Sequence, residues 1–284
     1  MYGRVAYDSQ RLYLNGSFIE GVTDHSSSFS SNKTDLLFAG TGYLQSVSEG
    51  EQGGEFSFSR VLSFDNDLVT GMFNGDVSGK FLYGVREEDF QVFNFERGRI
   101  SSYNISCEVG GIASSDIQVT CFGNMGGNGT EPYLPEYNYT NPKISISRAL
   151  NLDVAGSSTN RVQSIDYSIQ VNYSEEPFLS EIESSTTQIK VNYPVLIEST
   201  FVLDVDDYSS SRVFDLLCSA PTQNLNFSFD DCQYGITRKF YSPNAELSDI
   251  SYTSSLDGNM QYTLTYQSKI KNLSSIGAIL SLNV

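Results

Sequence analysis

The sequence has one histidine, His25, and no tryptophan among its 284 residues. A catalytic site that relied on histidine to move protons would therefore have to include His25. An internal repeat, described below, aligns His25 with Ile165 on the inward-facing side of a strand, so we predict a packed residue and not a catalytic one. Without tryptophan, the chain also lacks the largest aromatic face on which a sugar ring could stack.

Cysteine is also sparse, and its spacing does not resemble a zinc site. The four residues, Cys107, Cys121, Cys218 and Cys232, form no C-x-x-C motif. Cys107 and Cys121 lie on successive predicted strands, where a bridge is geometrically conceivable, but we expect both to be small buried thiols. Because cysteines stay reduced in the cytosol, we expect the protein to be assembled there. Whether the pairs Cys107/Cys121 and Cys218/Cys232 ever form disulfides is left open.

Positive charge is scarce relative to negative charge, with 17 basic against 34 acidic residues and a formal net charge of -17. Binding to phosphate backbones or anionic lipids needs a cationic face, so the composition argues against both. Two readings of the acidity stay open. It can serve solubility alone, or it can mark a surface that must not adhere to nucleic acid, such as the lumen of a DNA conduit.

Long hydrophobic runs are missing from both ends. Residues 1–14 carry Arg4, Asp8 and Arg11 among their apolar residues, so we expect no ordinary signal peptide. The apolar-leaning tail, residues 276–284, is far shorter than the about 20 residues that a membrane helix needs. We therefore expect no membrane segment, and we discount the N-x-S/T triplets as glycosylation sites.

Alternation of apolar and polar residues is the main structural signal. It runs through residues 103–109, 117–121, 165–173 and 260–266, and predicts half-buried antiparallel strands. Gly110-Gly111 and Asp257-Gly258 supply turn residues between these segments. Two stretches, residues 87–95 and 206–217, have apolar residues at helical spacing, so one short helix is predicted in each half of the chain.

Three pairs of blocks in the two halves match in the same order. Residues 99–111 align with 246–258 without a gap, residues 22–32 align with 162–172, and the region from Arg60 aligns with the region from Phe201. Residues 125–142, rich in glycine and then proline, are predicted to be a linker. The prediction is an all-β chain of two tandem, related β-sandwich or half-barrel domains, residues 1–124 and 143–284.

Residues with catalytic or metal-binding chemistry are few. The acidic groups Glu87-Glu88-Asp89, Glu175-Glu176 and Asp230-Asp231 are expected on solvated loops, although a glycosidase would need only two carboxylates facing one cleft. Asp204, Asp206 and Asp207 lack the glycine and distal glutamate of a calcium loop, and are expected to lead into a helix. Residues 123–129 are read as linker and not as a phosphate-binding loop. No catalytic, cofactor-binding or metal-binding residue is predicted, and no cofactor.

The segment YLNGSFIEGVTDHSSSFS, residues 13–30, resembles the start of tail tube proteins of tailed bacteriophages. Residues 98–122 and 244–268, each a hairpin after an irregular segment, resemble the recurring sandwich hairpins of that family. The resemblance extends from about residue 12 to about residue 270. It carries no residue-level role, because tube proteins share an arrangement of strands and not a set of catalytic residues.

The resemblance implies a non-enzymatic virion protein of the tail, assembled in the host cytoplasm. Such subunits form rings that stack into a tube around the tape measure protein, contact other tail proteins, and later conduct DNA without binding it specifically. Duplicated members of the family form trimers with pseudo-sixfold symmetry, so a trimer is favoured over a hexamer. Three alternatives stay open: another virion part such as a baseplate, neck ring or capsid decoration protein, a carbohydrate- or receptor-binding β-sandwich, and a hydrolase.

Overall fold

The computed structural model of the chain describes residues 10–30, 34–37, 44–47, 53–62, 72–73, 75–84, 89–122, 125–126, 130–132, 149–154, 157–159, 161–176, 188–205, 222–231, 236–254 and 260–272. Nearly all of these residues lie in antiparallel strands, which confirms the all-β prediction. No helix in this part of the chain is long and apolar enough to cross a membrane.

Strands in the first half of the chain are β1 (Gln10–Leu14), β2 (Ser17–Phe18), β3 (Val22–Ser30), β4 (Thr34–Leu37), β5 (Leu44–Val47), β6 (Gly53–Val61), β7 (Val77–Gly84), β8 (Asp89–Glu108) and β9 (Ser114–Phe122). Two short strands follow, β10 (Met125–Gly126) and β11 (Thr130–Pro132). The second half contributes β12 (Ala149–Val154), β13 (Ser157–Thr159), β14 (Val162–Glu176), β15 (Gln188–Val205), β16 (Gln223–Asp231), β17 (Ile236–Thr253) and β18 (Met260–Ile270).

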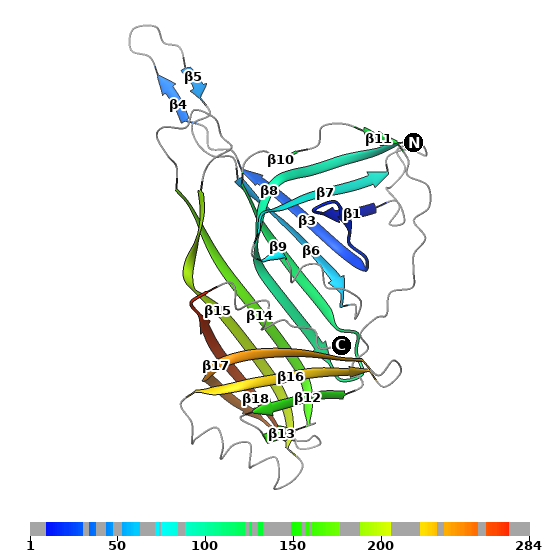
Figure 1. Ribbon diagram of the computed structural model, residues 1–284, viewed down its shortest axis with the longest axis vertical. Coiled ribbons are helices and arrows are strands. Elements are labelled where there is room, and N and C mark those ends of the chain that lie inside the picture. Colours follow the sequence, from blue (N-terminus) through cyan, green and yellow to red (C-terminus); the bar gives the residue numbers. More distant parts are fainter. Residues whose placement is uncertain are drawn as a thin grey trace.

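One continuous sheet joins the two halves, and β4 and β5 form a separate hairpin (Figure 1). Eight strands of the sheet lie in the order β3, β6, β9, β8, β14, β15, β18, β17, and we call this run the long sheet. The long strands β8 and β17 also pair with β7 and β16, which lead to β1 and β12. Figure 1 shows β16 and β17 crossing in front of β14 and β15.

The hydrophobic core lies between the long sheet and these crossing strands, because alternate side chains of each strand point inward. Its densest part is aromatic. The ring of Phe227 stacks on Phe240 at a centroid distance of 4.9 Å, and also contacts Tyr167 at 5.2 Å and Phe201 at 5.8 Å. Offset and edge-on contacts of this kind add to the stabilisation that burial provides.

The two halves repeat each other strand for strand. In the first half β1 pairs with β2 and β7, then β7 with β8, β8 with β9, β9 with β6, and β6 with β3. In the second half β12 pairs with β13 and β16, then β16 with β17, β17 with β18, β18 with β15, and β15 with β14. Each of these strands therefore has a counterpart with the same neighbours, whereas β4, β5, β10 and β11 have none among the described strands of the second half.

Bulges occur at matching places in both halves. The pairing of β3 with β6 shifts after Val22, and that of β14 with β15 shifts after Val162. The hairpin of β8 and β9 shifts after Ile100, and that of β17 and β18 shifts after Leu247. Because a bulge re-aims every following side chain, shared bulges are much stronger evidence of duplication than shared alternation.

Two of the three predicted alignments agree with these registers, and the third is wrong by two residues. In the described part of these blocks, residues 22–30 match 162–170 and residues 99–107 match 246–254, as the bulge positions require. In the third block Phe58, not Arg60, takes the place of Phe201, because Phe58 pairs with His25 while Phe201 pairs with Ile165. The domain boundaries at 124 and 143 stay predictions.

The helix predicted over residues 87–95 is wrong, since β8 begins at Asp89 and runs through that segment. Phe90 and Phe93, whose three-residue spacing suggested a helix, pair with Gly84 and Phe81 of β7 in an unbroken register. Pairing with a neighbouring strand therefore overrides the local spacing. The helix predicted over residues 206–217 lies outside the described residues.

The predicted linker is in part a pair of strands, because β10 and β11 both pair with β8. The rest of residues 125–142 lies outside the described residues. The turn predicted at Gly110 is confirmed by its φ of 78°. The hairpin predicted around Asp257-Gly258 agrees with the pairing of Thr253 with Gln261, while the turn residues themselves lie outside the described residues.

We expect Phe227→Ala to lower the free energy of unfolding by about 3 to 5 kcal/mol, the range for removing a buried aromatic side chain. Urea denaturation of dilute protein measures the change. Tyr252→Ala is the matched control, because Tyr252 is 68% exposed and its removal should change stability by no more than about 0.5 kcal/mol. Equal effects of the two substitutions would contradict the assignment of Phe227 to the centre of the core.

Candidate assembly interface

The two halves meet where β8 pairs with β14, and we call this pairing the internal seam. It runs from Ser102 opposite Gln170 to Glu108 opposite Ser164. On its inner face every side chain is buried, namely Tyr103, Ile105 and Cys107 from β8 and Ile165, Tyr167 and Ile169 from β14. The seam thus satisfies the backbone groups of two strand edges and buries apolar side chains along its length.

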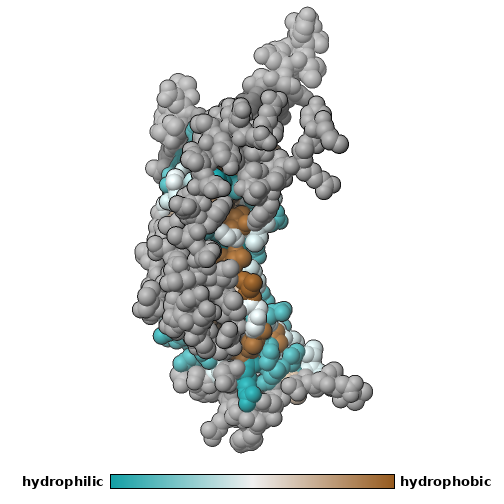
Figure 2. All heavy atoms as spheres, turned by 90° about the vertical axis from the view of Figure 1, so that its right-hand side faces the viewer, coloured by the Kyte–Doolittle hydropathy of each residue, from teal (hydrophilic) through white to brown (hydrophobic). Residues whose placement is uncertain are grey.

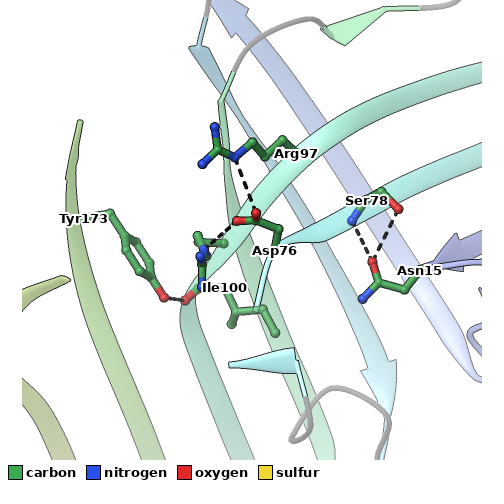
Figure 3. A network of polar contacts seen from close by, with 7 residues as sticks. Asn15, Asp76, Ser78, Arg97, Ile100 and Tyr173 are labelled. Carbon is green, nitrogen blue, oxygen red and sulfur yellow. Dashed lines mark hydrogen bonds and ion pairs between the residues drawn. The ribbon is translucent and has the colours of Figure 1, made fainter. Parts of the chain in front are cut away.

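Polar contacts fix the end of the seam at the β8 bulge. The hydroxyl of Tyr173, on β14, donates a hydrogen bond of 2.9 Å to the carbonyl oxygen of Ile100 (Figure 3). Burial raises the pKa of Tyr173 to about 12, so the phenol stays protonated as a donor. Beside it, Asp76 forms ion pairs with Arg99 at 2.8 Å and Arg97 at 3.5 Å.

The outer face of the internal seam is polar and carries two carboxylates. Glu108 and Asp166 line a shallow cavity of about 290 Å³ together with Ser106 and Ser164. Partial burial, and then the nearby Glu108 carboxylate, raises the pKa of Asp166. Two carboxylates therefore do share one depression, although neither belongs to the acidic clusters singled out in the sequence.

Two strand edges of the long sheet have no partner among the described strands. Among the described strands β3 pairs only with β6, which leaves the other edge of residues 24–30 without a strand partner. β17 pairs with β16 only as far as Ala245, which leaves residues 246–253 open on that side. These edges stand at opposite ends of the long sheet. Open edges invite pairing with another chain.

Each open edge carries an exposed aromatic residue. Phe29 on β3 is 47% exposed, and Tyr252 on β17 is 68% exposed. Their counterparts in the repeat, Ile169 and Ile105, are buried in the internal seam. A large apolar side chain left in water at a position that is buried in the other half marks a contact surface.

His25 lies on the open strand β3 and packs against an aromatic ring, which confirms the packed position that the repeat predicted. Its ring lies 3.7 Å from that of Phe81, and both line a cavity of about 590 Å³ with Arg11, Thr23 and Asp24. Partial burial lowers the pKa of His25, and the Asp24 carboxylate opposes that shift. In the second half the equivalent position is occupied by Ile165, which is buried in the core.

The outer face of the long sheet is predominantly acidic. Its side chains include the carboxylates of Asp24, Glu55, Glu108, Asp116, Asp166, Glu198, Asp204, Glu246 and Asp249, against Lys190, Lys269 and the ion-paired Arg99. In the side view of Figure 2, hydrophobic patches lie along the middle of the described surface and hydrophilic residues lie toward its two ends.

The residues considered for metal or acid-base chemistry do not assemble into a site in the described part of the chain. Asp204 accepts hydrogen bonds from the amides of Gln163 at 2.6 Å and Gln261 at 2.9 Å, while Asp206 and Asp207 lie outside the described residues. Among the residues that the structure describes, no cluster of His, Cys, Asp and Glu could hold a metal ion. The side chains of the three acidic clusters lie outside the described residues.

Cys107 and Cys121 are buried and are not disulfide-bonded, as predicted. Cys121 pairs with Gly98 and not with Cys107, so the two side chains are too far along the strands to bridge. Burial raises the pKa of Cys121 to about 12, which keeps its thiol protonated and unreactive. Cys218 and Cys232 lie outside the described residues.

No protein-family model matches the sequence, and none of the curated proteins matches it. Among solved structures, the chain is similar to a chain from the tail of an empty GTA particle determined by helical refinement with C6 symmetry. The two share 14% sequence identity and superpose with a TM-score of 0.31, over 42% of this chain and 89% of the other. Similarity at that level identifies no family for this chain.

Replacing His25 should change how stability depends on pH. Because the folded pKa of His25 is lowered, its contribution is present above the unfolded value of about 6.5 and is lost as the pH falls below it. His25→Phe keeps a ring on Phe81 but cannot titrate. As the pH falls from 7.5 to 5.5, we expect the free energy of unfolding of this variant to rise relative to that of the native chain. Urea denaturation at both pH values measures this, and a pH-independent difference would contradict it.

Proposed function

We propose that the chain is a structural, non-enzymatic subunit of a phage-type virion tail, and that copies of it form rings that stack into a DNA-conducting tube. The observation that carries the proposal is the duplicated long sheet, which closes one seam within the chain and leaves a matching edge open at each end. A unit of this kind is suited to a closed ring, because each end can meet the opposite end of the next copy.

The outer face of the long sheet supports the conduit part of the proposal. If that face lines the lumen, its carboxylates repel the phosphates of passing DNA and limit adhesion during transit. The same face is polar between the charges, with serine, threonine, asparagine and glutamine at the alternate positions of β3, β9, β14 and β18. In this proposal the lumen holds the tape measure protein before DNA passes.

We propose a ring of three chains, in which each chain supplies two equivalent units to a pseudo-sixfold ring. Other tail proteins would contact the ends of the stack. The site of action is the virion tail, with assembly in the host cytoplasm. The alternatives differ in behaviour: a decoration protein binds a preformed shell and does not polymerise, and a sugar- or receptor-binding module stays soluble and binds its ligand.

Negative-stain electron microscopy of the purified chain at high concentration, with mass photometry at low concentration, tests the proposal. We expect hollow filaments or stacked rings, and a species with the mass of three chains. The double variant Phe29→Ser with Tyr252→Ser is a matched control, because both residues are exposed in the monomer and should affect assembly without affecting folding. A persistent monomer at all concentrations would contradict the proposal.

A further inference from the structure

The internal seam has an unoccupied counterpart, and its two sides are the open edges of β3 and β17. Within the chain, β14 pairs with the C-terminal part of β8. The repeat makes β3 the counterpart of β14, and β17 the counterpart of β8. In the second half, no described strand takes the corresponding position beside residues 246–253 of β17.

We propose that β3 of a second copy of this chain pairs antiparallel with β17, in the register of the internal seam. The inference rests on the proposed function, and it specifies which surfaces join and which residues face each other. The bulge at Val22 corresponds to the bulge at Val162, so each residue of β3 is equivalent to the β14 residue whose number is higher by 140. The bulge at Ile100 corresponds to the bulge at Leu247, so each residue of β17 is equivalent to the β8 residue whose number is lower by 147.

The register follows from these two differences. In the internal seam Ser168 lies opposite Asn104, so Ser28 of one copy lies opposite Ser251 of the next, because 168 − 140 = 28 and 104 + 147 = 251. By the same rule Ser26 faces Thr253 and Ser30 faces Asp249 on the outer face. On the inner face Phe29 faces Ile250, and Ser27 faces Tyr252.

Side-chain chemistry fits this pairing. The two exposed aromatic residues of the open edges, Phe29 and Tyr252, both fall on the inner face of the new seam, where they are covered. The cavity beside Thr23, Asp24 and His25 lies at the end of the β3 edge. In the proposed seam Ser254 of the neighbouring copy lies next to this cavity, at the position that Cys107 has in the internal seam. Pairing would also satisfy the unpaired backbone groups of both edges.

The new seam is more polar than the internal one. Serine and histidine of β3 replace Tyr167 and Ile165, so less apolar area is buried when two copies meet than when the two halves of one chain meet. The expected consequence is a division of roles. The internal seam forms on folding, whereas the seam between copies forms only on assembly and dissociates more readily.

Disulfide trapping tests the register. Directly opposed strand residues have Cα atoms about 4.5 to 5.5 Å apart, within the range that a disulfide spans. We expect Ser28→Cys with Ser251→Cys, oxidised under assembling conditions, to move most of the chain into disulfide-linked dimers and trimers on a non-reducing gel. The native chain, treated in the same way, supplies the background from its own cysteines.

Two matched pairs control the experiment. Ser168→Cys with Asn104→Cys occupies the same positions in the internal seam, and should form a disulfide within one chain at any concentration. Ser26→Cys with Asp249→Cys is displaced by four residues from the proposed register, and should give no more linked product than the native chain. Each variant is first checked for assembly by electron microscopy in reducing buffer.

The outcomes separate the inference from the proposed function. Linked chains from Ser28→Cys with Ser251→Cys alone support the seam and its register. Rings or tubes without that link, while the internal pair does link, overturn the inference and leave the proposed function standing. A link from the displaced pair instead overturns the register. Failure of the native chain to assemble at any concentration overturns both.

Discussion

Edge-to-edge pairing of strands is the interaction on which this structure depends. An open sheet ends in two edge strands with unpaired backbone groups, and these edges must be covered, disrupted or paired with another strand. Here β14 pairs with the C-terminal part of β8, which satisfies the backbone groups of both edges and buries Tyr103, Ile105, Tyr167 and Ile169. Duplication then presents the same two kinds of edge at the ends of the long sheet.

The internal seam and the proposed seam between copies share one strand arrangement but differ in polarity. The internal seam buries apolar residues from both strands, whereas serine and histidine on β3 take the places of Tyr167 and Ile165. Exposed Phe29 and Tyr252 are the exceptions to this polarity, and they are the residues that a partner edge would cover. The acidity of the outer face gives the free subunits mutual repulsion as well.

Much of this arrangement was predictable from sequence alone. Alternation identified the strands over 103–109, 165–173 and 260–266, and the repeat placed His25 at a packed position. Strand pairing was not predictable, because alternation marks the two faces of a strand and not the residues that lie opposite it. The Arg60 block was therefore aligned two residues away from its counterpart, and the spacing of Phe90 and Phe93 resembled a helix. Phe29 and Tyr252 were missed because alternation alone marks them as core, and only the pairing exposes them.

A cryo-electron microscopy reconstruction of the assembled chain measures the central claim most directly, since it resolves which strands close the ring. The account predicts an unbroken belt of strands in which β17 of one copy lies beside β3 of the next, superposable on β8 beside β14 within each chain. A ring closed by any other pair of strands, or one in which the β3 and β17 edges both face solvent, would contradict it.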